Sequence, residues 1–110
     1  KFAWHQDSGD VENGDPMTKH KPYLTCWITL DDVNEENGPV FLHPTPVAAQ
    51  HTLAEHFREE GTNDLIGYTG DEPGDPLIVP AGSIVGFRSY NFHRSGANTS
   101  PNMRRVYLAQ

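Results

Sequence analysis

Glycine and proline divide this chain into short pieces. The 110 residues include ten Gly and nine Pro, and the apolar or alternating runs between them are all brief. Short runs bounded by turn residues are typical of strands, whereas a helical bundle needs long amphipathic stretches. The chain is therefore expected to be all-β, and a long helical bundle is not expected.

The expected strands are rich in β-branched and aromatic residues or alternate in polarity. They cover residues 2–7, 23–30, 40–43, 77–79, 84–87, 90–93 and 104–110, with a further short strand at 65–68. Residues 8–22 are polar and are expected to form a loop. Residues 47–60 carry an imperfect helical stripe that stops at Gly61, so they are predicted to form one helix. This pattern indicates a small antiparallel sandwich or barrel.

Composition limits the kinds of molecule that the chain is expected to bind. The formal net charge is −7, which argues against a nucleic acid or an anionic membrane as a partner, since both require a concentrated basic surface. Cys26 is the only cysteine, so an internal disulfide is excluded and a buried, inert thiol in an intracellular, cytoplasmic protein is expected. The length suits one domain, and the missing initiator Met and the strand-like end suggest an excerpt from a longer polypeptide. The oligomeric state is not predicted.

The tripeptide His5-Gln6-Asp7 is the sharpest local feature. Residues two apart in a strand project from the same face, so His5 and Asp7 are expected to face one metal ion while Gln6 points away. His93, at the end of a later strand, is the best third ligand. Two histidines and one carboxylate leave adjacent coordination positions open and are characteristic of non-haem iron(II) oxygenases.

A chelating 2-oxo acid would also need a cation for its far carboxylate. Arginine suits this role because its planar fork can bind a carboxylate through two hydrogen bonds. Arg104 and Arg105 open the last expected strand, and alternation puts only one of them inside. The pattern alone does not choose between them.

Several motifs together resemble the phytanoyl-CoA dioxygenase family, in the right order and over nearly the whole chain. They are Trp4-His5-Gln6-Asp7, Cys26-Trp27, Asn37-Gly38-Pro39, Val79-Pro80-Ala81-Gly82-Ser83, His93-Arg94-Ser95-Gly96-Ala97-Asn98 and an arginine eleven residues after His93. The resemblance implies a double-stranded β-helix, a jelly-roll barrel with iron(II) at its mouth. It also implies a reaction in which O2 and 2-oxoglutarate hydroxylate a small molecule and release succinate and CO2.

The resemblance also implies roles for seven residues. It implies that the metal ligands are His5, Asp7 and His93, and that the residues binding 2-oxoglutarate are Arg104, Ser95, Trp27 and Thr25. Spacing selects Arg104 over Arg105, because the family arginine lies eleven positions after the second histidine. Trp27 would also suit the core of any β-barrel, and Ser95 could simply hold a turn.

The chain departs from the family pattern at two places. The family usually continues to a Pro-Gly-Ser-His turn, where this chain has His43-Pro44-Thr45-Pro46, and the family's N-terminal helical region is absent. Asp7 is retained, whereas related halogenases replace it, so hydroxylation is favoured. Two alternatives stay open, namely a cupin-like metal enzyme without oxidation and a catalytically silent binding domain. The sequence does not identify the substrate.

Overall fold

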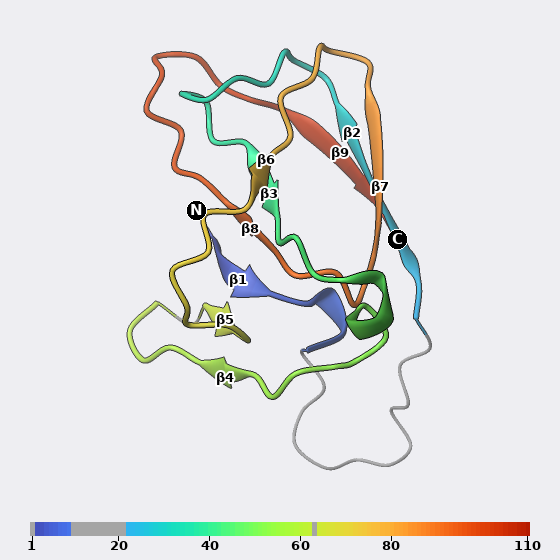
Figure 1. Ribbon diagram of the computed structural model, residues 1–110. Coiled ribbons are helices and arrows are strands. Elements are labelled where there is room, and N and C mark those ends of the chain that lie inside the picture. The colour runs from blue at the N-terminus through green and yellow to red at the C-terminus, as the bar shows by residue number, and fades with distance from the viewer. Residues whose placement is uncertain (1, 10–21, 63) are drawn as a thin grey trace.

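The computed structural model describes residues 2–9, 22–62 and 64–110, and these form antiparallel sheets (Figure 1). One sheet has the order β1 (Phe2–His5), β8 (His93–Ser95), β3 (Val40–Leu42), β6 (Asp75–Pro76). The second has the order β7 (Ile84–Arg88), β2 (Leu24–Thr29), β9 (Val106–Ala109). A small third sheet pairs β4 (Phe57–Arg58) with β5 (Leu65–Ile66). The expected all-β, jelly-roll-like architecture is confirmed, although the strands of the described residues do not close into a barrel.

Strand β2 shows why the sequence pattern works in the second sheet. Its residues alternate between exposed or half-buried positions and buried ones, and Thr25, Trp27 and Thr29 are the buried set. Trp27 pairs with Val85 of β7 and with Leu108 of β9, so strands flank it on both sides. This alternation is expected where one face of a sheet covers the core.

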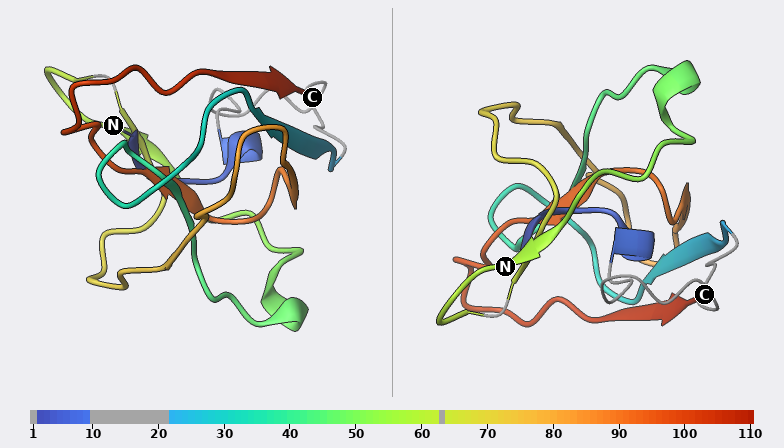
Figure 2. Two further views of the ribbon diagram at one scale, coloured as in Figure 1. Left: turned by 90° about the horizontal axis from the view of Figure 1, so that it is seen from above. Right: turned by 90° about the horizontal axis from the view of Figure 1, so that it is seen from below.

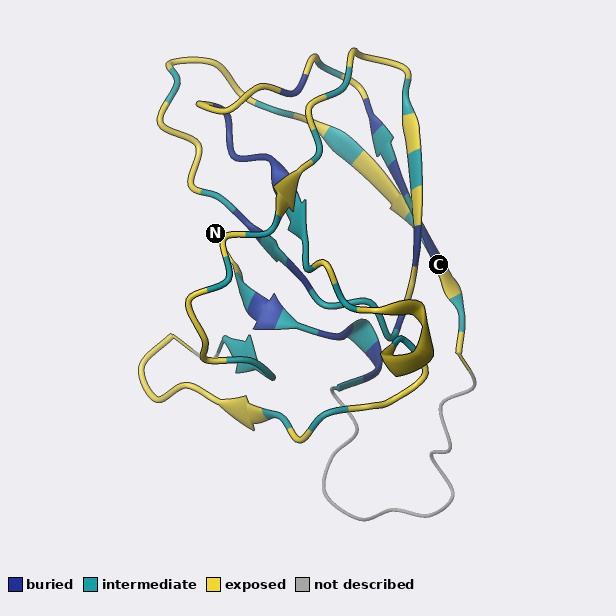
Figure 3. Cartoon of the chain, viewed as in Figure 1, coloured by how far each residue is buried: buried dark blue, intermediate teal, exposed yellow. Residues whose placement is uncertain are grey.

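The apolar core lies between the two larger sheets. Trp27 and Phe87 come from the second sheet, Val40 comes from the first, and Val33 follows β2. All four are less than one tenth exposed. Half-buried residues pack against them, namely Leu42, Leu77, Val79, Val85 and Val106. Figure 3 shows buried positions in dark blue along the chain.

The predicted helix at 47–60 is wrong. Only a single 3₁₀ turn, η2 (Val47–Ala49), forms there, and the chain then runs extended into β4. The turn projects away from the two larger sheets (Figure 2). The apolar residues of the expected stripe therefore have no surface to cover: Val47 is 72% and Phe57 53% exposed. Helices of this length depend on such packing more than on intrinsic propensity, so the segment is not helical.

Other differences concern strand boundaries. Leu77–Val79 was expected as a strand, but the ladder pairing lies at Asp75–Pro76. The strand expected at 90–93 instead begins at His93 and runs to Ser95, after a turn at Ser89 and Tyr90. Of the loop expected at 8–22, residues 10–21 lie outside the described part.

Cys26 is only half-buried, not fully buried as expected, because the alternation of β2 turns it away from the core. No helix in the described ranges is long and apolar enough to cross a membrane.

Candidate metal centre

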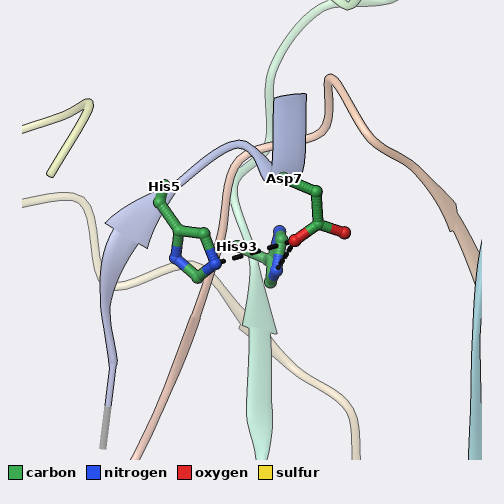
Figure 4. A group of neighbouring side chains, drawn as sticks. All are labelled: His5, Asp7 and His93. Atoms are coloured by element: carbon green, nitrogen blue, oxygen red, sulfur yellow. Dashed lines mark ion pairs between the residues drawn. The ribbon is translucent and has the colours of Figure 1, made fainter. Parts of the chain in front are cut away.

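His5, Asp7 and His93 converge at one point (Figure 4). His5 ends β1 and His93 begins β8, and the two residues are paired in the antiparallel ladder. The same-face argument had assumed that Asp7 lies in the strand, but it does not. The strand ends at His5, and a 3₁₀ turn, η1 (Asp7–Gly9), is closed by a hydrogen bond from the Gly9 N–H to the Gln6 carbonyl. This turn brings the Asp7 carboxylate back toward both imidazoles.

The distances suit a shared ion. Asp7 Oδ1 lies 3.7 Å from His5 Nε2 and 3.3 Å from His93 Nε2. One ligand atom from each of the three residues lies within 4.8 Å of the others. Ligand atoms about 2.1 Å from one metal ion and at right angles to each other would be about 3 Å apart. The two distances from Asp7 Oδ1 are therefore close to the spacing of atoms that share one metal ion.

The tautomers of both histidines also suit metal binding. Nδ1 of His5 lies 2.8 Å from the Ala3 carbonyl oxygen, and Nδ1 of His93 lies 3.1 Å from that of Asn91. A carbonyl oxygen only accepts, so each Nδ1 carries the proton and donates it. This leaves the lone pair of a neutral ring on Nε2, the atom that faces Asp7. Metal-binding histidines are commonly oriented by such a hydrogen bond.

Electrostatics favours the protonation states that bind metal. Burial, and next the proximity of His93, lower the pKa of His5, which favours its neutral ring. Burial alone would raise the pKa of Asp7, but the contacts with His93 and Thr25 bring that pKa below its usual value. A neutral imidazole and an ionised carboxylate are the forms that bind a metal ion.

A cavity of about 310 Å³ opens beside the three residues. All seven predicted site residues line it, since Thr25, Trp27, Ser95 and Arg104 join the three candidate ligands. The rest of the lining is mostly apolar and consists of Phe2, Val40, Phe87, Arg94, Val106 and Leu108. Its volume lies at the lower end of the ~300–1,000 Å³ usual for small-molecule pockets.

The two adjacent arginines have different surroundings. Arg104 lines the cavity, where its Nε donates to the Asn37 carbonyl at 3.0 Å and its guanidinium lies 5.4 Å from the Trp27 ring centre. Burial lowers its pKa from a very high ordinary value. Within the described ranges it forms no ion pair, whereas Arg105 binds Asp31 at 2.7 Å on the surface. Of these two arginines, Arg104 is thus the one available to a ligand in the cavity.

Ser95 and Trp27 each have a structural contact as well as a place in the cavity wall. The Ser95 hydroxyl oxygen accepts a hydrogen bond from the Phe2 N–H at 2.9 Å, which ties β1 to β8. Trp27 is 4% exposed and belongs to the core, while it also lies beneath Arg104. Their places in the lining agree with the expected cosubstrate pocket, and their roles toward a cosubstrate stay predictions.

Sequence reasoning missed what Gln6 does. The expectation that Gln6 points away from the metal ligands is confirmed. Its side chain is 1% exposed, and both its amide nitrogen and its amide oxygen form hydrogen bonds. Its Nε2 donates to the carbonyls of Thr52 and Tyr90, and its Oε1 accepts from the Ala54 N–H. The backbone N–H of Gln6 donates to His56 Nε2 at 3.0 Å. A glutamine between two candidate ligands gives no sequence signal of such a role.

Comparison with known proteins agrees with the geometry. The family model of phytanoyl-CoA dioxygenase (PhyH) matches residues 1–106. An ectoine dioxygenase of Bordetella parapertussis is 30% identical, with 92% of this chain and 37% of that protein covered. The phytanoyl-CoA dioxygenase domain-containing protein 1 of Danio rerio is 33% identical, with 76% of this chain and 31% of that protein covered. An ectoine dioxygenase of Stutzerimonas stutzeri is 28% identical, with 94% of this chain and 39% of that protein covered.

The chain thus spans between a third and two fifths of the length of most of these relatives. The match to the family model extends from the first β-strand to the start of β9 and includes all seven cavity residues predicted from the sequence. The chain belongs to the phytanoyl-CoA dioxygenase family.

Proposed function

We propose that this chain forms the catalytic core of an iron(II)- and 2-oxoglutarate-dependent dioxygenase that hydroxylates a small molecule. The observation that carries the proposal is the convergence on a single cavity of two imidazoles, one carboxylate and Arg104, which forms no ion pair with any described residue. His5, Asp7 and His93 would hold the iron. Bound there with O2, iron supplies the oxidative chemistry that converts 2-oxoglutarate to succinate and CO2 and hydroxylates the substrate.

Arg104 has the chemistry to orient the cosubstrate. It lies in the same cavity as the three ligands, and its Nε bond to Asn37 holds the guanidinium in place. The guanidinium nitrogens beyond Nε are left to form two parallel bonds with the far carboxylate of 2-oxoglutarate. Trp27 supports the guanidinium with its ring, and the Ser95 hydroxyl hydrogen is available to a nearby carboxylate oxygen.

Much of the cavity wall beside the reacting groups is apolar. Val40, Phe87, Val106 and Leu108 contribute side chains that form no hydrogen bonds. A ligand bound against this wall would displace water, and the lower local dielectric constant would strengthen the interaction of Arg104 with a carboxylate.

A small molecule is the substrate class that the comparisons favour. The name of two of the relatives reported above, ectoine dioxygenase, points to a small organic substrate for those proteins. The acidic composition of this chain, with net charge −7, argues against a polyanionic polymer. Hydroxylation, as distinct from halogenation, is supported by the retained Asp7 carboxylate.

The test starts with the full-length protein under anaerobic conditions. Iron(II) and 2-oxoglutarate are added, the visible iron-to-oxoglutarate charge-transfer band is recorded, and oxygen is then admitted while succinate is assayed. The proposal expects both the band and the succinate. Folded protein that gives neither the band nor succinate would refute the proposal.

Two variants separate the roles. His5→Ala is expected to abolish iron binding, whereas Arg104→Ala is expected to weaken 2-oxoglutarate binding and leave iron in place. Arg105→Ala is the matched control, since Arg105 is the neighbouring arginine and contacts Asp31 outside the cavity.

A further inference from the structure

We propose that Thr25 is a positioning residue that restricts Asp7 to binding metal through a single oxygen, Oδ1. The inference rests on the proposed metal site and extends it to the opposite sheet of the sandwich. Thr25 lies in β2, whereas His5 and His93 lie in β1 and β8 of the other large sheet. The Thr25 hydroxyl donates to Asp7 Oδ2 at 2.7 Å.

The two oxygens of Asp7 have separate partners. Oδ1 faces Nε2 of His5 and Nε2 of His93, and Oδ2 accepts from Thr25. The Gln110 amide adds a weaker hydrogen bond to Oδ2 at 3.2 Å. A carboxylate whose second oxygen already accepts hydrogen bonds has less tendency to turn and chelate the metal through both oxygens. Single-oxygen binding would leave one more coordination position open for a cosubstrate.

The Thr25 hydroxyl is itself held in direction. Gln110 Nε2 donates to Thr25 Oγ1 at 3.3 Å, so the oxygen accepts on that side and its own hydrogen is left for Asp7. The side chain is 1% exposed, and β2 pairs with strands on both sides, so Thr25 has little freedom to move. Hydrogen bonds of this kind to a ligating carboxylate orient it and tune its affinity for metal.

The test compares Thr25→Val with Thr29→Val in the full chain. Valine keeps the β-branched shape and removes only the hydroxyl. Thr29 is the matched control because it lies on the same strand and face, is 0% exposed, and donates its hydroxyl to the Pro80 carbonyl at 2.8 Å, away from Asp7. Cobalt(II) serves as the probe, since its visible spectrum reports the coordination number and its affinity is measured without turnover. Thermal unfolding is recorded for each variant.

Thr25→Val is expected to weaken cobalt(II) binding by about 10–100-fold and to change the visible spectrum of the bound ion. Thr29→Val should lower thermal stability while leaving affinity and spectrum unchanged. Thr25→Ser, which keeps a hydroxyl, should restore both properties. If Thr25→Val does not fold, Thr25→Ala is compared with Thr25→Ser in the same way.

The outcomes distinguish this inference from the proposed function. Wild-type protein that binds no cobalt(II) would overturn both. Wild-type binding that Thr25→Val reproduces in affinity and spectrum would overturn the positioning role alone, as would a Thr25→Ser variant as weak as Thr25→Val.

Discussion

Replacement of Gln6 by methionine should destabilise the fold strongly, although Gln6 is not a candidate ligand. Methionine has a similar length and no amide, so the carbonyls of Thr52 and Tyr90 and the N–H of Ala54 would lose their partners. The three bonds measure 2.8, 2.7 and 2.8 Å. At about 0.5–1.5 kcal/mol each, their loss should lower the free energy of unfolding by roughly 3 kcal/mol. For a domain of this size, that corresponds to a fall in Tm of roughly 12–24 °C.

Urea unfolding, followed by tryptophan fluorescence, measures the effect. Gln50→Met is the control, because Gln50 makes one comparable bond, from Nε2 to the Thr45 carbonyl at 2.9 Å. Its loss should cost about 1 kcal/mol, a third of the effect at Gln6. Equal losses for the two variants, or a loss below about 1 kcal/mol for Gln6→Met, would refute the view that Gln6 anchors segment 52–54 beside the candidate ligands.

Three further predictions concern the arginines and a glycine. Arg104→Ala should raise the Kd for 2-oxoglutarate by roughly 30-fold or more, measured by titration of the charge-transfer band, while Arg105→Ala leaves it unchanged. Hydrogen bonds from Arg105 hold the pKa of Asp31 at about 2. The stability that this pair adds to the fold is therefore complete above about pH 4 and is lost as the pH falls toward 2. In an NMR titration, Arg105→Ala should return this pKa toward 3.8. Gly38→Ala should lower the free energy of unfolding in urea by about 1–3 kcal/mol more than Gly82→Ala does. Both glycines have positive φ, but of the two only Gly38 has a backbone atom, the Gly96 carbonyl oxygen, 2.9 Å from the position of an added Cβ.

Strand β2 and the two arginines illustrate what the sequence predicts well. In β2 the alternation of apolar and polar positions coincides with burial, because both of its edges are paired and only one face covers the core. Alternation also implied that Arg104 and Arg105 face opposite ways, but it could not say which one points inward. The spacing from His93 in the family pattern resolved that choice, and the structure places Arg104 in the cavity.

The failures arise where tertiary contacts outweigh local preference. Segment 47–60 has a helical stripe, but its apolar side chains find no surface, and Gln6 binds its backbone at Thr52 and Ala54. Asp7 was expected to share a strand face with His5, and instead reaches it through a 3₁₀ turn. The first error depends on Gln6, whose contacts with this segment join residues almost fifty positions apart. A local sequence window contains no information about such partners.

The pairing of His5 with His93 also bears on how the chain folds and is synthesised. The two residues are partners in adjacent strands, although 87 residues separate them in the sequence. Contacts between distant residues form slowly, because closing a long loop has a large entropic cost that must be met before the contact forms. Until His93 has emerged from the ribosome, the nascent chain lacks this candidate ligand and its supporting strand. Metal uptake at the candidate centre is thus expected only after His93 has been synthesised and β8 has paired with β1.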